Sequence, residues 1–372
     1  MSHIGSQVSL GAGASGVAVD LETKSSSQFT LKVHLQNGSF NIIKYGDATD
    51  IKSIITLLTS NLGNQQDSPR PYQQMYAIRL THPRSGEVYW LHQDMNMFQV
   101  DEKHISKHPS DEWNYNLRIR YHPQKISDLY EKDRVSFYYY YDQVASDYLA
   151  KQPTDIEQDL AVQLGVLHMR YYFKDMAHVA LDRKSNFDYV EKEVGLHRFL
   201  PRSVIDAAKP KAIRKAIQSQ FKSVAKLSER DAAFRFLDLL RSHMEYDHER
   251  FHVSLGSGWS IPVELVIGPG LGISYVTHQA TTPTKMAELS RIQAIQTLMT
   301  ECEAHRKAMV QLRVAGTSES LTVTCASMEA AESLADLIDG YCRLSAGTNT
   351  SLWNRKGTLL FVVCISSRAR KR

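Results

Sequence analysis

Residues Phe29 to Tyr45 read FTLKVHLQNGSFNIIKY, two runs of β-branched and aromatic residues on either side of an Asn37-Gly38 pair. An Asn-Gly pair between two such runs is a strong local signal for a β-hairpin. The folded part of the chain is therefore expected to begin at Phe29. Residues 1–27 are rich in Gly, Ser and Ala and have few large apolar side chains, so we expect them to be disordered.

The residues after this hairpin predict one helix and three further strands. Thr49 or Asp50 can cap a helix in which apolar residues recur at helical spacing; these are Ile51, Ile54, Ile55 and Leu58. Residues 76–82, 87–92 and 115–122 alternate as strands do. This order suits a small mixed sheet wrapped on one helix, as in ubiquitin. We therefore assign residues 28–121 to a ubiquitin-like β-grasp lobe.

The period of the apolar residues changes at Pro123. Helices are predicted around residues 135–148, 156–171, 189–194, 204–224 and 230–244, so residues 122–246 are interpreted as an all-helical bundle. Strands return in residues 247–346, and Ser327 can cap a last helix. About seven antiparallel strands closed by one helix is the order of a pleckstrin-homology-like sandwich. Residues 347–372 are left as a divergent tail.

Composition describes an ordinary globular chain rather than a function. The 372 residues are 42% apolar and 23% charged, with a formal net charge of +4, which excludes collagen-like and disordered classes. A charge this close to neutral argues against nucleic acid as the primary partner. The charge is uneven, however: residues 202–226 contain seven basic residues and one acidic residue, a net charge of +6. Such a segment suits anionic lipid headgroups, although many charged helix faces are simply solvated.

A search for catalytic and metal-binding patterns gives no enzyme site. Gly268 to Gly272 (GPGLG) resembles a phosphate loop, but its proline removes an N–H group and a strand follows, so a hairpin turn is the better interpretation. His104 and His108 have no acidic third ligand at metal-site spacing and are interpreted as solvated. The four cysteines show no zinc or redox spacing and are interpreted as reduced thiols. No kinase active-site set, cofactor or metal is expected.

Several strings carry a resemblance to a known family. They are GDATD (Gly46 to Asp50), VYWLHQDM (Val88 to Met95), EWNYNLRIRY (Glu112 to Tyr121), KSNFDYVEKEVGLHRF (Lys184 to Phe199), ELVIGPGLGISY (Glu264 to Tyr275), and LTVTCAS followed by ADLIDGYCRL (Ala335 to Leu344). Together with the lobe order they resemble the FERM domain of focal adhesion kinases. The resemblance implies an α+β cloverleaf of three lobes: the ubiquitin-like lobe, an acyl-CoA-binding-protein-like helical bundle, and the pleckstrin-homology-like sandwich with its C-terminal helix.

The resemblance also implies a function and two sites. In this family the module is non-catalytic, binds phosphoinositide membrane, a tyrosine kinase domain and the cytoplasmic tails of adhesion or growth-factor receptors, and works in integrin signalling. A kinase-docking patch that holds the kinase inactive falls on Phe173, Met176, Asn186 and Tyr189, with departures from the family pattern at Phe173 and Tyr189. A phosphoinositide patch falls on Lys209, Lys211, Arg214 and Lys215. The implied location is the cytoplasm, peripherally at the plasma membrane and focal adhesions.

Two features depart from the family pattern. Pro210 lies inside the basic pattern, and because proline is tolerated in the first helical turn, we expect a helix to begin near Pro210 with Lys209 just before it. The chain ends before the kinase domain that the family places next, so a truncated, invertebrate form is expected. Residues 359–365 form an apolar run that is too short to cross a bilayer.

Two alternative functions remain open at this point. The first is that the chain is a fragment of an intact non-receptor tyrosine kinase. The second is a cytoskeletal FERM linker of the ezrin or talin type.

Overall fold

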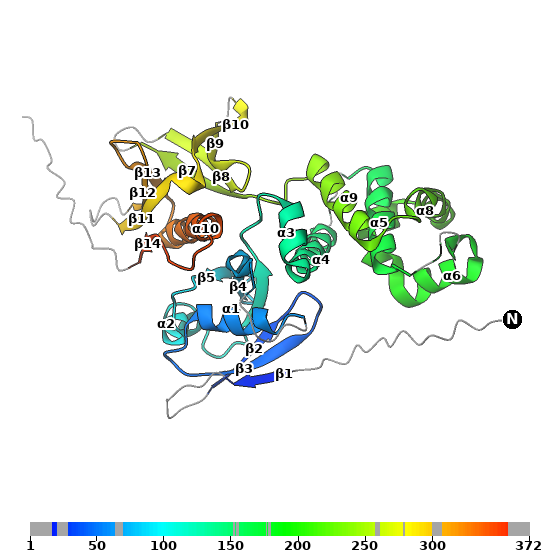
Figure 1. The fold of residues 1–372 in the computed structure, drawn as a ribbon, viewed down its shortest axis with the longest axis horizontal. Coiled ribbons are helices and arrows are strands. Elements are labelled where there is room, and N and C mark those ends of the chain that lie inside the picture. Colours follow the sequence, from blue (N-terminus) through cyan, green and yellow to red (C-terminus); the bar gives the residue numbers. More distant parts are fainter. Residues whose placement is uncertain are drawn as a thin grey trace, which may run out of the picture. The chain divides into compact units, whose positions relative to one another are not determined.

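The computed structural model in Figure 1 describes residues 17–20, 29–63, 70–151, 153, 156–175, 177, 180–256, 261–277, 280–299 and 307–355. Contacts divide the chain into two units. Unit 1 combines Met1–Ser136 with Asp247–Arg372, and unit 2 is Phe137–Tyr246.

The first sheet of unit 1 has six strands in the order β1-β3-β2-β6-β4-β5. The strands are β1 (Val17–Asp20), β2 (Phe29–His34), β3 (Phe40–Tyr45), β4 (Tyr76–Thr81), β5 (Val88–Leu91) and β6 (Asn114–Ile119). Strands β2 and β3 form the predicted hairpin, with Gly38 at a φ of 83° in its turn. Positive φ is costly for a residue with a Cβ atom, so glycine suits this position. The β-grasp prediction is confirmed.

Helix α1 (Ile51–Ser60) lies across this sheet (Figure 1). The Asp50 side chain accepts from the backbone N–H of Ser53, which makes Asp50 the N-cap. The predicted apolar face is buried, since Ile51, Ile54 and Leu58 have no exposed surface. A second helix, α2 (Met97–Lys103), was not predicted, although Asn96 and Gln99 form a capping box at its start. Short 3₁₀ turns lie at Gln73–Met75 (η1) and Ile105–Lys107 (η2).

The secondary-structure elements of unit 2 are all helical among its described residues (Figure 1), as predicted. The helices of this region are α3 (Ile126–Lys132, in unit 1), α4 (Arg134–Ala150, which crosses the boundary), α5 (Gln158–Tyr172), α6 (Lys184–Tyr189), α7 (Arg202–Ala207), α8 (Pro210–Val224) and α9 (Glu229–His243). Short 3₁₀ turns lie at Ala180–Asp182 (η3) and Leu196–Arg198 (η5), and a π-helical segment, Val190–Gly195, follows α6. The predicted helix over residues 204–224 is therefore two helices, because the chain is extended at Ala208 and Lys209.

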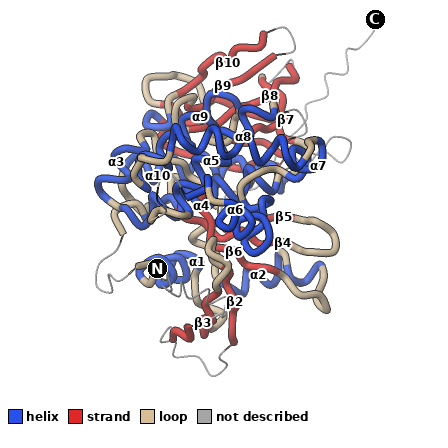
Figure 2. The backbone as a smooth tube through the Cα atoms, turned by 90° about the vertical axis from the view of Figure 1, so that its right-hand side faces the viewer, coloured by secondary structure: helices blue, strands red, loops and turns tan. Residues whose placement is uncertain are grey.

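The second sheet of unit 1 has eight strands in the order β10-β9-β8-β7-β13-β12-β11-β14. The strands are β7 (Glu249–Leu255), β8 (Ile261–Gly268), β9 (Gly272–Thr277), β10 (Ala280–Ala287), β11 (Ile292–Met299), β12 (Ala308–Val314), β13 (Leu321–Cys325) and β14 (Trp353–Asn354). Strands β7 to β10 lie side by side (Figure 2). Helix α10 (Met328–Ala346) packs on this sheet, capped by Ser327 as predicted. A further 3₁₀ turn, η6 (Leu289–Arg291), precedes β11. Residues 268–272 form the predicted hairpin turn between β8 and β9.

The predictions for the two ends of the chain, a disordered segment over residues 1–27 and a tail over residues 347–372, need correction because each contains a strand. Within the segment expected to be disordered, β1 pairs in parallel with β3, from Val17 opposite Asn41 to Asp20 opposite Lys44. Within the expected tail, β14 pairs in parallel with β11. Its start is held by the backbone N–H groups of Leu352 and Trp353, which donate to Asp339 Oδ1. The apolar run 359–365 lies outside the described residues.

Cys325 and Cys342 are free and buried, and burial raises the pKa of their thiols to about 11 and about 12. Cys302 and Cys364 lie outside the described residues. None of the helices in the described ranges has the length and hydropathy that crossing a bilayer requires.

Candidate functional site

The basic segment predicted to bind phosphoinositide lies on helix α8. Lys209 is the N-cap and Pro210 the first helical residue, so the predicted helix start is confirmed. Proline suits this position because its missing N–H would have no partner within the helix. One face of α8 is buried in the bundle through Ile213, Ile217, Phe221 and Val224. The basic side chains lie on the remaining faces of the helix.

Three of the four predicted phosphoinositide residues are exposed. Lys209, Lys211 and Lys215 are exposed, and within the described part of the chain none of them has an ion-pair partner. Lys211 and Lys215 are four residues apart, so they lie on the same side of the helix. The first turn of α8 contains no acidic residue. The positive end of the helix dipole and these lysines therefore repel one another, and the site favours an anion.

Arg214 is different from the three lysines. One of its guanidinium nitrogens lies 2.6 Å from Asp188 Oδ1 and 2.7 Å from Glu191 Oε2, and the guanidinium lies 4.5 Å from the Phe187 ring centroid. The hydrogen bonds to Asp188 and Glu191 raise the pKa of Arg214. Arg214 thus joins α8 to α6 and to the π-helical segment. The sequence pattern grouped it with the lysines, but the structure assigns it to an internal ion pair.

The predicted kinase-docking residues lie on two elements of unit 2. Phe173 caps the C-terminal end of α5, half-buried, with its ring 5.8 Å from that of Phe199. On α6, Tyr189 is 45% exposed, whereas the Asn186 side chain points back to donate to the carbonyl oxygen of Ala180 at 2.9 Å. Met176 lies outside the described residues. Tyr189 and Phe173 are therefore the members of this set with accessible aromatic surface.

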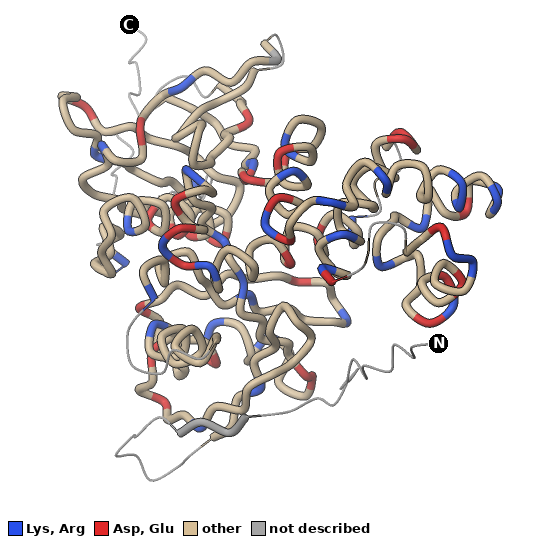
Figure 3. Tube along the Cα trace, turned by 45° about the vertical axis from the view of Figure 1, so that its right-hand side comes forward, with Lys and Arg blue, Asp and Glu red and all other residues tan. Residues whose placement is uncertain are grey.

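Positive charge by itself does not locate this site. Lys and Arg are distributed over both units with acidic residues between them (Figure 3). In the segment 202–226, for example, Lys222 Nζ lies 3.3 Å from Asp182 Oδ1. Other lysines, such as Lys125, Lys132 and Lys151, are also exposed and lack an ion pair among the described residues. Lys209, Lys211 and Lys215 differ from them because they lie together at the N-terminal end of α8.

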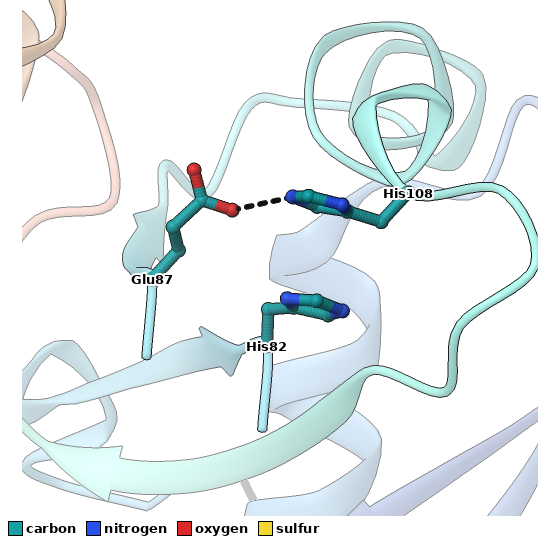
Figure 4. A group of neighbouring side chains, drawn as sticks. All are labelled: His82, Glu87 and His108. Carbon is teal, nitrogen blue, oxygen red and sulfur yellow. Dashed lines mark hydrogen bonds and ion pairs between the residues drawn. The ribbon is translucent and has the colours of Figure 1, made fainter. Parts of the chain in front are cut away.

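A second cluster of titratable groups lies at the turn between β4 and β5 (Figure 4). The ligand atoms of His82, Glu87 and His108 lie within 4.8 Å of one another. The two imidazole rings are stacked, with centroids 4.1 Å apart and planes 4° apart. The lone pair of an imidazole nitrogen lies in the ring plane, so two stacked parallel rings cannot both point at one ion.

Three of the four ring nitrogens of this cluster also have hydrogen-bond partners. The backbone N–H of Ser85 donates to His82 Nδ1 at 3.1 Å, so His82 Nε2 carries the proton and donates to Asp111 Oδ2, also at 3.1 Å. His108 Nε2 lies 2.9 Å from Glu87 Oε2. The arrangement is a hydrogen-bonded network that fixes the turn, and a metal would require one ring to rotate.

The expectation that His104 is solvated is wrong. His104 is only 4% exposed, and its ring lies 4.3 Å from that of Tyr89. Burial, together with the charges of Lys103 and Lys107, lowers the pKa of His104 to about 4. Helix α2 ends at His104 and places it in this buried environment. The capping box of Asn96 and Gln99 was the sequence signal for this helix.

A buried polar interface within unit 1 was also missed. Arg120, at the end of β6, donates to Asp336 on α10 and to Glu249 on β7, the latter at 3.0 Å. Nearby, Arg343 Nε donates to Asp339 Oδ2 at 2.8 Å, and His92 Nε2 lies 3.3 Å from the same oxygen. These contacts join the β-grasp sheet to α10.

Asp339 is the centre of this second group of contacts. Burial would raise the pKa of Asp339, but the hydrogen bond with His92 and the charge of Arg343 outweigh it, and the pKa lies below its ordinary value. Asp336, Asp339 and Arg343 recur at helical spacing among the apolar residues of α10. Charged residues on the face of α10 that is otherwise apolar were the sequence signal for this buried polar interface.

Comparison with protein families identifies the chain. Three family models match consecutive segments: the FERM N-terminal domain over residues 27–123, the FERM central domain over residues 127–251, and the FAK1/PYK2 FERM domain C-lobe over residues 253–352. The chain is a FERM domain. Its C-lobe is of the FAK1/PYK2 type, which confirms the resemblance to the focal adhesion kinase family.

Two curated proteins are similar to this FERM domain. Inactive tyrosine-protein kinase kin-32 of Caenorhabditis elegans is 26% identical over 320 residues, which cover 83% of this chain and 36% of that protein. FERM and PDZ domain-containing protein 1 of Mus musculus is 25% identical over 343 residues, which cover 88% of this chain and 21% of that protein. The FERM domain thus spans about a third and about a fifth of these two relatives.

Solved structures support the three-lobe α+β FERM fold. The FERM and C-terminal domain complex of Drosophila Merlin aligns with a TM-score of 0.60 at 12% identity, over 85% of this chain and 96% of that chain. The MyTH4-FERM MF2 domain of Dictyostelium discoideum myosin VII aligns with a TM-score of 0.59 at 15% identity, over 85% of this chain and 58% of that chain. At these identities the likeness concerns the fold alone.

Proposed function

We propose that this FERM domain is a non-catalytic targeting and regulatory module that binds anionic, phosphoinositide-containing membrane through Lys209, Lys211 and Lys215. The observation that carries the proposal is that these three lysines are exposed at the start of α8 and lack ion-pair partners among the described residues. Arg214 is left out of the binding set because Asp188 and Glu191 already neutralise it.

The energetics favour an external anion at this site. Cations near a helix N-terminus oppose the helix dipole, at a cost of about 0.3–1 kcal/mol each. A phosphate group would reverse that cost and pair with the lysines. Each basic residue near an anionic membrane contributes about 1 kcal/mol, so three lysines give about 3 kcal/mol, or roughly a hundredfold in affinity. An interaction of this size suits a weak, reversible, peripheral contact with a membrane.

A vesicle co-sedimentation assay tests the proposal. The probe is phosphatidylcholine vesicles with and without phosphatidylinositol bisphosphate, at physiological salt. The variant K209A/K211A/K215A is expected to bind the phosphoinositide vesicles roughly a hundredfold more weakly, with an unchanged or slightly raised midpoint of unfolding. The matched control K125A/K132A/K151A removes three exposed lysines outside α8 and should bind as the unchanged chain does. Unaltered binding of the α8 variant would refute the proposal.

We further propose that the exposed aromatic side chains of unit 2 dock a protein partner, with a tyrosine kinase domain of the focal adhesion kinase family as the candidate. Tyr189 and Tyr172 are 45% and 38% exposed, and such rings are enriched in protein interfaces. One similar protein is named an inactive tyrosine-protein kinase. We also propose that this domain binds the cytoplasmic tails of receptors and that it acts in integrin signalling at focal adhesions. Calorimetric titration with a purified kinase domain tests it: Tyr189→Ala should weaken binding, and no heat with the unchanged chain would refute it.

A further inference from the structure

A pocket of about 410 Å³ lies within unit 1, between strand β5 and helices α2 and α10. Its aromatic lining comes from Tyr89, Trp90 and Trp353. Its charged lining comes from four carboxylates and two cations, namely Glu87, Glu329, Glu332, Asp336, Lys103 and Arg355. The pocket lies outside the basic helix α8 and outside the membrane-binding function proposed above.

Two buried polar atoms in the wall of this pocket have no hydrogen-bond partner among the described residues. They are Nδ1 of His104, a residue 4% exposed, and Oδ1 of Asp336, a residue 2% exposed. The other carboxyl oxygen of Asp336 is occupied by Arg120 and by the Tyr121 hydroxyl. An unpaired buried polar group costs about 1–3 kcal/mol. A ligand that satisfied both atoms would recover that cost.

Both atoms can accept hydrogen bonds. Burial and the neighbouring lysines lower the pKa of His104 to about 4, so its imidazole is neutral at pH 7. In the tautomer with the proton on Nε2, Nδ1 is an acceptor, as Asp336 Oδ1 is. Around them, Glu332 is paired with Lys103, and Glu329 lies 2.9 Å from Lys107. The two unpartnered acceptors therefore need hydrogen-bond donors from a ligand. The carboxylates of the lining favour a donor group that carries a positive charge.

A guanidinium group supplies what this lining lacks. It is always charged, carries five N–H donors in one plane, and stacks on aromatic rings. The same walls already hold such groups: the guanidinium of Arg120 lies 4.9 Å from the Trp90 ring centroid, and that of Arg355 lies 5.6 Å from the Trp353 ring centroid. The aromatic lining is thus compatible with a third, external guanidinium.

The rim of the pocket points to the source of that group. Strand β5 is at the edge of its sheet and pairs only with β4 among the described strands. Val88 on this strand is 50% exposed, and Val88, Tyr89 and Trp90 all line the pocket. An exposed edge strand can accept an extended peptide as an additional strand, whose side chains then enter neighbouring pockets.

We propose that this pocket binds the arginine side chain of an extended peptide that pairs with the free edge of β5. The guanidinium donates to Asp336 Oδ1 and His104 Nδ1, and the carboxylates that line the pocket favour its positive charge. The peptide backbone supplies the remaining affinity through β5.

Fluorescence anisotropy with designed peptides tests this assignment. The probe is a short fluorescein-labelled peptide of alternating Thr and Val with one central arginine. Replacing that arginine by citrulline keeps the shape but removes the charge, and should weaken binding about tenfold or more, since hydrogen bonds with a charged partner are the stronger kind. Proline on both sides of the arginine removes backbone N–H groups and should also weaken binding. Equal binding of the arginine and citrulline peptides would overturn the proposal.

Two variants separate binding from folding. His104→Phe keeps a ring against Tyr89 but removes the unpartnered nitrogen, so it should weaken peptide binding severalfold while the unfolding midpoint stays the same or rises. Glu332→Gln should also weaken binding. The matched control is Glu102→Gln, an exposed carboxylate of α2 outside the pocket lining, which should bind as the unchanged chain does. Unchanged binding in both His104→Phe and Glu332→Gln would place the peptide elsewhere and refute the assignment.

Discussion

The charged residues of unit 1 and those of helix α8 in unit 2 differ in their partners. In unit 1, Arg120 has a side chain with no exposed surface and is surrounded by Asp336, Glu249 and the Ser333 carbonyl. On α8, Lys209, Lys211 and Lys215 are exposed and, among the described residues, unpaired. Buried charges with several partners hold elements together, whereas exposed charges of one sign are available to an external ligand.

Removing Arg120 is expected to have the largest effect on stability. Arg120→Met leaves the buried carboxylate of Asp336 without its cation, and breaking a buried pair in this way costs about 3–5 kcal/mol. Urea denaturation measures the change. The double variant R120M/D336L should recover much of the loss, because an apolar pair can replace a buried ion pair. A single-variant loss below about 1 kcal/mol, as for an exposed pair, would contradict the role assigned to this interface.

A pH titration gives an effect of comparable size in unit 2. His168 is enclosed by aromatic rings, its Nδ1 lies 2.7 Å from the Tyr141 hydroxyl, and burial together with Arg198 lowers its pKa to about 4. Because the unfolded chain binds this proton more tightly, the stabilisation is complete above the ordinary pKa of 6.5 and is lost as the pH falls toward 4. A difference of this size amounts to up to about 3 kcal/mol.

The variant His168→Gln keeps a hydrogen-bond partner for Tyr141 but cannot titrate. Its unfolding free energy should depend less on pH between 6.5 and 4 than that of the unchanged chain. Parallel pH profiles for the two proteins would show that His168 is not the group responsible.

A smaller effect is expected where α10 packs on the β-grasp lobe. A Cβ atom added at Gly340 would collide with the ring of Tyr121, whereas one added at Gly270 meets nothing within 4 Å. Gly340→Ala should therefore cost about 1–3 kcal/mol through overpacking. Gly270→Ala is the control with no such contact. Equal thermal unfolding midpoints for the two variants would contradict the close packing of α10 on Tyr121.

Arg214 should give the smallest loss of stability in this series. Its ion pairs with Asp188 and Glu191 are partly solvated, and partly solvated pairs contribute little. Arg214→Gln should lower the unfolding midpoint less than R120M does. A larger shift than that of R120M would contradict the prediction that the buried charges of unit 1 contribute more to stability than those of α8.

The sequence predicted those parts of the fold that local pattern determines. The Asn37-Gly38 turn, the Asp50 cap and the Pro210 start of α8 are each set by residues close together in the chain. Strand β10 is not indicated by local pattern because its residues, ATTPTKMA, are polar and include a proline, so they lack the apolar alternation of a half-buried strand.

The partners of individual charges could not be predicted in the same way. Arg120 and Asp336 are 216 residues apart, and Arg214 and Asp188 are 26 residues apart. Arg214 and Lys215 are neighbours in a basic run. Only Arg214 reaches Asp188 and Glu191, whereas the ammonium group of Lys215 has no ion pair among the described residues. The lysines of the candidate site were found from the sequence, whereas the pairing that excludes Arg214 required the structure.

The most direct test of the account compares these neighbours in one assay. Co-sedimentation with phosphatidylinositol bisphosphate vesicles at physiological salt would be measured for the unchanged chain, for K209A/K211A/K215A and for Arg214→Gln. We predict that the lysine variant loses most of its binding and that Arg214→Gln retains most of it. Loss of binding in Arg214→Gln together with retention in the lysine variant would contradict the assignment of Lys209, Lys211 and Lys215 as the membrane-binding residues.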